Sequence, residues 1–308
     1  MIHVPLITPF GPDGRVDLAA LERLGHDLLE AGAGGLVALG TTAEAAALEP
    51  DERAAVTAAV GRICRAHGAR FTVGVGGAGS TRRAAREVAA LAGLPEAPDA
   101  ALVTVPSFTR PGEAGVLAHF REVAAASPVP VLIYHVPYRT GQPLSAATLV
   151  ALAAIPGVAG VKYAAGEVTA ETVALLRSAP EGFEVLAGDD VFAPALLALG
   201  AHGAILASAH LATREWAALA AAGPGAGDVS GGRGLSALAA AVFSEPNPAV
   251  VKAVLHAQGR IPTPDVRLPL LPASPSAATA ALTALAAVEG APREAGVAAA
   301  AGPGRLAP

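Results

Sequence analysis

The chain contains little of what disulfide-bonded, metal-cysteine or nucleic-acid-binding proteins need. Only one of its 308 residues is a cysteine, Cys64, which excludes a disulfide framework and a zinc site built from cysteines. Charged residues make up 15% of the chain and the net charge is −5, whereas phosphate binding needs clustered Lys and Arg. We therefore expect a free intracellular thiol and no nucleic-acid partner.

Long uninterrupted apolar runs are also lacking, although hydrophobic residues make up 53% of the chain. The two stretches of more than 20 residues without Asp, Glu, Lys or Arg, 191–213 and 268–288, are both interrupted by proline or glycine. The N-terminus has neither the basic nor the apolar region of a secretory signal. The sequence predicts a cytoplasmic protein with no membrane partner.

What the chain does contain is a regular alternation of short and long segments. Short runs rich in β-forming residues recur at 3–7, 35–39, 71–75, 101–105, 131–134, 158–161, 184–186 and 204–206. The segments between them have helical spacing of leucine, as in 17–30. Strands separated by helices pair in parallel, so eight such units predict an α/β fold, a closed (β/α)8 TIM barrel.

Beyond about residue 211 this alternation stops. Helical patterns follow at 213–222, 235–243, 249–258 and 276–288, and the glycine-rich stretch 223–234 is predicted to be a loop. The last residues are Ala, Gly and Pro with few anchors, which predicts disorder. The expected organisation is a barrel at 1–211, a helical extension at 212–289 and a disordered tail at 290–308.

Lysine is the scarcest of the common charged residues. Of 21 Lys and Arg residues only Lys162 and Lys252 are lysines. Arginine stays protonated, whereas a desolvated lysine can act as an amine nucleophile. Lys162 ends the apolar run 158–161, so we expect it at the C-terminal mouth of the sixth strand, where barrel enzymes hold their active sites. Lys252 lies in a helical pattern outside the barrel and is interpreted as structural.

Polar residues also follow other strands. Tyr134 closes the fifth strand, and a phenol beside an amine can shuttle protons during imine formation, although it can equally serve packing. The turn at 40–42 offers N–H groups and two hydroxyls to a carboxylate, or has ordinary turn chemistry. Arg139 can grip a carboxylate or be a solvated cation. One of Asp189 and Asp190 is expected to cap a helix.

Competing motifs are weaker. Residues 74–79 match G-x-G-x-x-G between a strand and a helix, but the next strand ends without the acidic residue that holds a ribose. No Walker loop and no G-x-S-x-G motif occurs. The eight histidines lack H-x-H and H-E-x-x-H spacing. We expect neither a dinucleotide nor a metal.

Six segments, taken in order, carry a resemblance. They are PLITPF at 5–10, GTTAE at 40–44, YHVPYRTG at 134–141, GVK at 160–162, GDD at 188–190 and EPNP at 245–248. In this arrangement the chain resembles the dihydrodipicolinate synthase and N-acetylneuraminate lyase family, which are class I, lysine-dependent pyruvate lyases. The resemblance extends from about residue 4 to residue 288.

This resemblance implies a mechanism without a cofactor. Lys162 is expected to form a Schiff base with pyruvate, and the resulting enamine attacks an aldehyde. Tyr134 relays protons, with Thr42 hydrogen-bonded to it. Thr41 and Thr42 hold the pyruvate carboxylate, and the backbone of Ile205 lies near the imine. Family members are commonly dimers or tetramers, so a homo-oligomer is implied.

The choice of aldehyde depends on fewer residues. Arg139 resembles the synthase branch, in which an arginine holds the carboxylate of aspartate semialdehyde. Three residues depart from that branch: Phe108 stands where a neighbouring subunit lends a tyrosine, His135 replaces an asparagine, and Ala43 replaces a glycine. We treat Phe108, His135 and Gly188 as accessory positions. A 2-keto-3-deoxy sugar acid or sialate-type aldolase and a non-catalytic keto-acid-binding protein stay open as alternatives.

Overall fold

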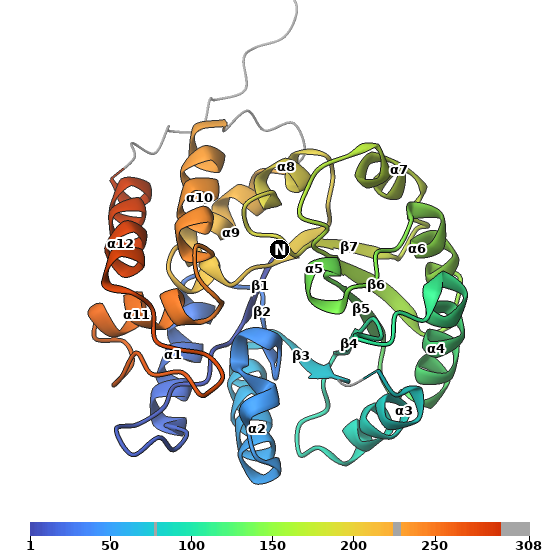
Figure 1. Cartoon of the computed structure of the whole chain (residues 1–308), viewed down its shortest axis with the longest axis horizontal. Coiled ribbons are helices and arrows are strands. Elements are labelled where there is room, and N and C mark those ends of the chain that lie inside the picture. The colour runs from blue at the N-terminus through green and yellow to red at the C-terminus, as the bar shows by residue number, and fades with distance from the viewer. Residues whose placement is uncertain (77–78, 224–228, 291–308) are drawn as a thin grey trace, which may run out of the picture.

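Parallel strands close into a barrel in which each strand pairs with the next and the last pairs with the first (Figure 1). The computed structural model of the chain describes residues 1–76, 79–223 and 229–290. Within them the barrel strands are β1 (Ile2–Pro5), β2 (Gly35–Ala38), β3 (Arg70–Val75), β4 (Ala100–Thr104), β5 (Val131–His135), β6 (Val158–Tyr163), β7 (Glu184–Ala187) and β8 (Gly203–Ile205). Each overlaps one predicted strand, so the predicted barrel is confirmed.

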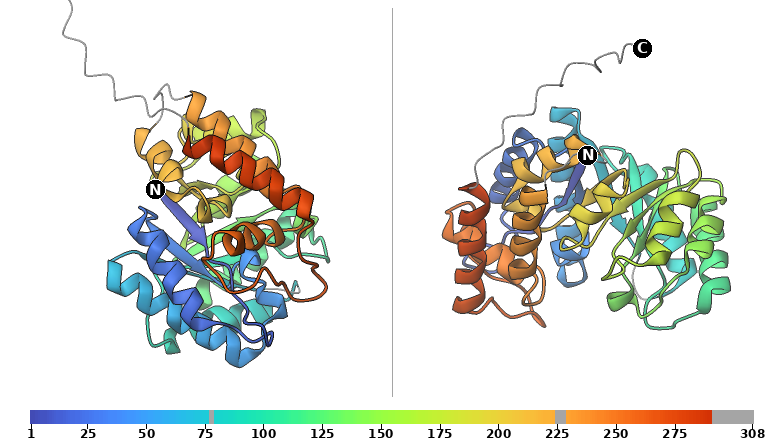
Figure 2. Two further views of the ribbon diagram at one scale, coloured as in Figure 1. Left: turned by 90° about the vertical axis from the view of Figure 1, so that its left-hand side faces the viewer. Right: turned by 90° about the horizontal axis from the view of Figure 1, so that it is seen from above.

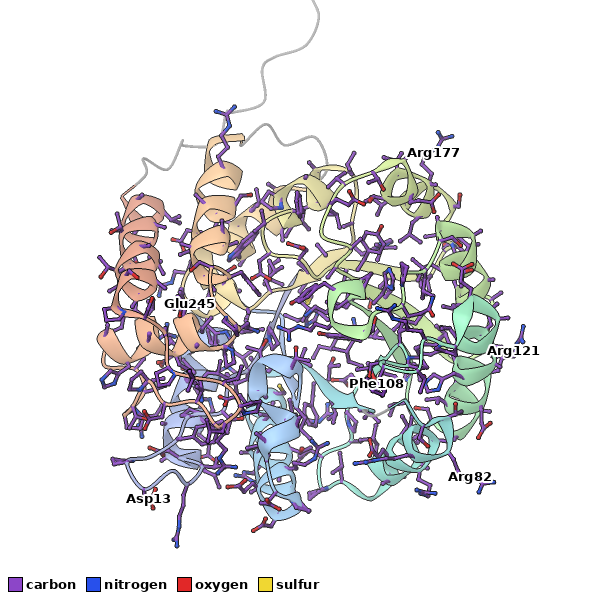
Figure 3. All side chains as sticks on the ribbon, viewed as in Figure 1. Asp13, Arg82, Phe108, Arg121, Arg177 and Glu245 are labelled. Atoms are coloured by element: carbon purple, nitrogen blue, oxygen red, sulfur yellow. The ribbon has the colours of Figure 1, made fainter. Side chains whose placement is uncertain are left out.

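Helices form a ring around these strands (Figure 1). They are α1 (Leu18–Glu30), α2 (Pro50–His67), α3 (Thr81–Ala89), α4 (Gly112–Ala126), α6 (Ala146–Ala153), α7 (Ala170–Ser178), α8 (Ala193–Ala198) and α9 (Thr213–Ala222). Local sequence sets their starts: the side chain of Asp17 accepts from the N–H of Ala20 at 2.9 Å, and Pro50 occupies the first position of α2. Arg82, Arg121 and Arg177 point outward from the ring (Figure 3).

The last helices pack together on one side of the barrel (Figure 2). They are α10 (Val229–Val242), α11 (Ala249–Ala257) and α12 (Pro275–Glu289), and α10 packs against α12 and α8. The loop predicted for 223–234 is therefore wrong from Val229 onward. Glycine weakens a helix by roughly 1 kcal/mol per residue, but burial of Leu235 and Leu238 offsets this. At Gly232 a Cβ would lie 3.2 Å from Pro194, so glycine also permits the close packing on α8.

Some predictions fall on residues outside the described ranges. Residues 77 and 78 of the glycine motif, 224–228 of the predicted loop and 291–308 of the predicted tail lie there. In the described ranges no helix is long and apolar enough to cross a bilayer.

Side-chain alternation along the strands separates two apolar layers. A large core fills the space between strands and helices, and a smaller one lies inside the barrel: Val37, Ala100, Leu102, Leu132, Tyr134, Val136, Ala164, Leu186 and Ile205. The N-terminal end is closed by an ion pair of 2.7 Å between Arg70 and Glu184. Tyr134 and Lys162 lie at the opposite end of the barrel, near the C-terminal ends of β5 and β6.

Candidate active site

A cavity of about 610 Å³ opens at the C-terminal mouth of the barrel. Its lining includes most of the residues that the sequence singled out: Thr41, Thr42, Tyr134, Arg139, Lys162, Gly188, Asp189 and Asp190. They come from the ends of β2, β5, β6 and β7 and the segments that follow. The mouth of the barrel therefore gathers residues up to about 150 positions apart in the sequence.

Lys162 and Tyr134 are direct neighbours in the barrel wall. They are paired in register on β6 and β5, and both side chains turn inward while the next residues, His135 and Tyr163, face the helices. The Nζ atom of Lys162 lies 5.4 Å from the centroid of the Tyr134 ring. A phenol is thus placed beside the amine, as the strand ends predict.

Burial changes the acid–base behaviour of Lys162. Only 8% of the residue is exposed, and desolvation lowers its pKa from 10.5 to about 8 against the opposing effect of Asp190. Since each pKa unit is a factor of ten, this raises the neutral fraction at pH 7 about 300-fold. The amine at the mouth is therefore available as a nucleophile near neutral pH.

Gly188 makes room for the Lys162 side chain. A Cβ at this position would lie 2.5 Å from Cγ and 2.7 Å from Cε of Lys162, far inside van der Waals contact. The N–H of Gly188 donates to the carbonyl of Tyr163 at 2.8 Å, which fixes the backbone at the end of β7. Glycine is needed here for a close approach of side chain to backbone.

The threonine turn lies across the cavity in a short 3-10 helix, η1 (Thr41–Ala43). The hydroxyls of Thr41 and Tyr134 are hydrogen-bonded at 3.3 Å. The prediction that Thr42 is hydrogen-bonded to Tyr134 is therefore wrong, because Thr41 makes this bond. Thr42 instead accepts a hydrogen bond of 2.8 Å from Nδ2 of Asn247, because the C-terminal extension reaches this side of the turn.

Two carboxyl groups face the lysine from the end of β7. Oδ2 of Asp190 accepts from both the N–H and the hydroxyl of Ser208 at 2.7 Å, so this residue fixes the start of the turn after β8. Desolvation raises the pKa of Asp190 to about 6 and also raises the pKa of Asp189. The predicted cap of the next helix is wrong: α8 begins after Phe192 with no side-chain cap from the described residues, and Asp189 accepts from the N–H of Val191 at 3.2 Å. The charge of Asp190 acts instead on Lys162.

Arg139 lies at the outer edge of the cavity, on the short helix α5 (Pro137–Thr140). Its Nε donates to the hydroxyl of Tyr138 at 2.8 Å, and its guanidinium carbon lies 5.0 Å from the centroid of that ring. Arg139 shares the lining of the cavity with the acidic residues Asp189, Asp190 and Glu245. A carboxylate at this edge would meet a cation held in place by a phenol.

Three predicted residues lie elsewhere. Phe108 is 95% exposed in the loop after β4 and does not line the cavity (Figure 3). His135 is buried behind the barrel wall, with its ring 5.6 Å from that of Tyr163. The side chain of Ile205 belongs to the apolar layer inside the barrel, and Ala207 lines the cavity instead.

No role is predicted for Asn247 from the sequence, although its segment carries the resemblance. Asn247 lines the cavity, and its Oδ1 is buried without a hydrogen-bond partner among the described residues. The sequence feature that could have indicated Asn247 is its position directly before Pro248, which precedes α11. In the described ranges no group of three or more His, Cys, Asp or Glu side chains is arranged to hold a metal ion.

Comparison with known proteins gives a consistent result. The family model described as the dihydrodipicolinate synthetase family matches residues 1–288. The 4-hydroxy-tetrahydrodipicolinate synthases of Laribacter hongkongensis and Moorella thermoacetica are 39% and 38% identical to the chain. These matches cover 87% and 89% of this chain and 91% and 92% of the relatives.

Solved structures are similar over nearly the same length. The chloride-inhibited dihydrodipicolinate synthase from Acinetobacter baumannii, complexed with pyruvate, shares 33% identity with a TM-score of 0.86, over 93% of this chain and 98% of that chain. The dihydrodipicolinate synthase from Thermotoga maritima shares 28% identity with a TM-score of 0.87, over 94% and 98%.

Proposed function

This chain belongs to the dihydrodipicolinate synthetase family, and we propose that it condenses pyruvate with an aldehyde through a Schiff base on Lys162. The observation that carries the proposal is the buried amine of Lys162, with a pKa of about 8, beside the Tyr134 phenol and open to a cavity of about 610 Å³. Curated relatives named 4-hydroxy-tetrahydrodipicolinate synthase support the same reaction type.

The chemistry follows from these groups. Nζ of Lys162 adds to the ketone carbon of pyruvate, and loss of water from the adduct leaves an iminium ion. The Tyr134 phenol delivers the proton with which the oxygen leaves as water. The iminium then withdraws electrons from the pyruvate methyl group, which loses a proton to form an enamine. The enamine carbon forms a bond to the aldehyde carbon, whose oxygen takes up a proton, and the iminium is regenerated. Water then adds to the iminium carbon, and cleavage of its bond to Nζ of Lys162 releases the keto acid product and the free amine.

The threonine turn suits the carboxylate of pyruvate. Thr41 and Thr42 line the cavity and lie in a short 3-10 helix whose N-terminal N–H groups can donate to an anion. We propose that these two residues hold the carboxylate and so place the ketone carbon near Lys162. A contact of the imine with the backbone of Ile205 stays a prediction.

For the aldehyde we propose aspartate semialdehyde. The supporting feature is Arg139, a cation at the open edge of the cavity that can bind the carboxylate of an acidic acceptor. The names of the curated relatives favour the same acceptor over an uncharged sugar.

The Schiff base is tested by trapping. Sodium borohydride with pyruvate should leave a reduced three-carbon adduct on the peptide that contains Lys162, and mass spectrometry identifies the residue. The Lys162→Arg variant should carry none, because its guanidinium stays protonated. An unmodified Lys162 peptide in the native enzyme would refute the proposal.

The acceptor is tested by comparing aspartate semialdehyde with neutral aldoses in a coupled assay. Arg139→Ala should raise KM for the acidic acceptor about tenfold or more, the value of one charge-assisted contact of ~1.5 kcal/mol. The control is Arg121→Ala, an exposed arginine on the outer face of α4. Equal turnover of aldoses by the native enzyme would favour a sugar-acid aldolase instead.

We further propose that the chain works as a homo-oligomer, a dimer or tetramer, with Phe108 at a contact between copies. Phe108 is the most exposed large apolar residue described, and its φ of 68° lies in the left-handed region that side chains rarely adopt. Phe108→Ser should shift the mass in analytical ultracentrifugation toward the monomer, and an unchanged mass would contradict the contact. A cytoplasmic location stays a prediction.

A further inference from the structure

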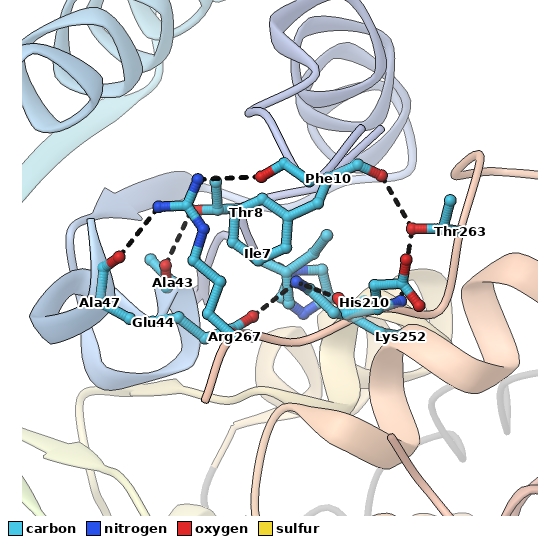
Figure 4. A network of polar contacts seen from close by, with 12 residues as sticks. Ile7, Thr8, Phe10, Ala43, Glu44, Ala47, His210, Lys252, Thr263 and Arg267 are labelled. Carbon is cyan, nitrogen blue, oxygen red and sulfur yellow. Dashed lines mark hydrogen bonds and ion pairs between the residues drawn. The ribbon is translucent and has the colours of Figure 1, made fainter. Parts of the chain in front are cut away.

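The second lysine of the chain is also buried. Lys252 lies on α11, and 0% of the residue is exposed. Its Nζ donates to Oε1 of Glu44 at 2.5 Å and to the carbonyl of Asp265 at 2.8 Å, and lies 3.9 Å from the centroid of the Phe10 ring (Figure 4). A buried charge is costly unless it has such partners. The ion pair with Glu44 therefore compensates for the burial of the Lys252 ammonium group.

Glu44 ends the threonine turn in a conformation that needs support. Its φ of 54° and ψ of 34° are left-handed, and its N–H closes the turn on the carbonyl of Thr41 at 3.1 Å. Both carboxylate oxygens are engaged, Oε1 by Lys252 and Oε2 by the N–H of Arg267 at 2.7 Å. Two segments of the C-terminal extension therefore hold the residue that closes the turn.

Every residue of the turn has its own partner. Thr41 is hydrogen-bonded to Tyr134, Thr42 accepts from Asn247, and the carbonyl of Ala43 accepts from Thr8 at 2.8 Å. Glu44 completes the series with Lys252. Asn247 and Lys252 lie close together in the sequence, around the start of α11. This segment therefore binds the turn at two residues, Thr42 and Glu44.

We propose that Lys252 is a positioning residue for pyruvate, which acts through its buried ion pair with Glu44 to fix the Thr41–Thr42 turn. This inference rests on the proposed function, because it assigns the turn to the pyruvate carboxylate. Lys252 touches no substrate. The helical extension thus sets the affinity for pyruvate, and the barrel supplies the chemistry.

The test compares Lys252→Met, Glu44→Gln and the double variant. Lys252→Met removes the ammonium and leaves the buried carboxylate without its cation, so KM for pyruvate should rise about ten- to a hundredfold, as a displacement of about 1 Å can produce. The kcat value should change less than about threefold. Borohydride should still label Lys162 completely, but at correspondingly higher pyruvate.

The double variant separates positioning from stability. With both charges removed, no unpaired ion is buried, so the fold should recover much of the stability that Lys252→Met loses. The link from α11 to the turn is still missing, so KM should stay raised. A KM that returns to the native value together with Tm would overturn the proposal, and so would a native KM in Lys252→Met or Glu44→Gln.

The control is Glu184→Gln, which breaks the ion pair of Glu184 with Arg70 at the opposite end of the barrel. It should lower Tm without raising KM for pyruvate. The outcomes distinguish the two proposals: no adduct in the native enzyme refutes the Schiff base, whereas a native adduct with unchanged pyruvate dependence in all three variants refutes only the role of Lys252.

Discussion

Replacement of Gly188 by alanine adds a single carbon atom next to Lys162, and so tests whether the position of the Lys162 amine matters for the reaction. The φ of Gly188 lies outside the left-handed region, so alanine is compatible with its backbone, and the perturbation is steric. The new Cβ would lie 2.5 Å from Cγ of Lys162, whereas carbon atoms prefer about 3.5 Å or more, so the side chain must move by about 1 Å. A misplacement of that size can cost about 10²-fold in rate, or about 2.7 kcal/mol of transition-state stabilisation.

The assay is the rate of borohydride-trapped adduct at subsaturating pyruvate, measured beside kcat/KM for the condensation. The control is Gly93→Ala, where a new Cβ meets no atom of the described residues within 4 Å. Gly188→Ala should retain the native circular dichroism and lose about 10²-fold in both rates, and Gly93→Ala should lose neither. Native trapping rates in a folded Gly188→Ala variant would show that the path of the Lys162 side chain does not limit the reaction.

Further predictions concern the amine and the phenol. Because burial lowers the pKa of Lys162 to about 8 and only the neutral amine reacts, the trapping rate should rise with pH and level off above about pH 8; a rise that continues to pH 10 would indicate an ordinary lysine. Tyr134→Phe should lower kcat about 10²-fold through loss of the proton relay. Tyr163→Phe, which removes a hydroxyl 3.3 Å from Thr172 behind the barrel wall, should leave kcat within about threefold. Equal losses would assign the effect to packing.

The sequence predicts those features that depend on local periodicity. The alternation of short and long segments predicts the barrel. Lys162 and Tyr134 follow the ends of apolar runs, and they lie at the same mouth because parallel strands share a direction. The glycine-rich start of α10 is misread, since burial of its leucines against α12 and α8 outweighs a poor helix propensity. Tertiary packing overrides local preference there.

Partners far apart in the sequence are the ones that pattern analysis misses. Asn247 donates to Thr42 across 205 positions, and Lys252 donates to Glu44 across 208. Neither pair has a spacing rule, because the extension reaches the turn only through the closed fold. The same limit explains why Thr42 is assigned to Tyr134 from resemblance when Thr41 makes that bond.

The two lysines show that burial alone does not make a nucleophile. Desolvation lowers the pKa of Lys162 and of Lys252 to about 8 in each case. Lys252 nevertheless donates to Glu44 and to Asp265 and faces the Phe10 ring, so its protons are held and no space is left for a ketone. In the described part of the chain no carboxylate forms an ion pair with Lys162, whose amine opens to the cavity. The contact at the nitrogen atom therefore distinguishes the two roles. A lysine beside a carboxylate forms a structural ion pair, whereas a lysine that opens to a cavity can act as a nucleophile.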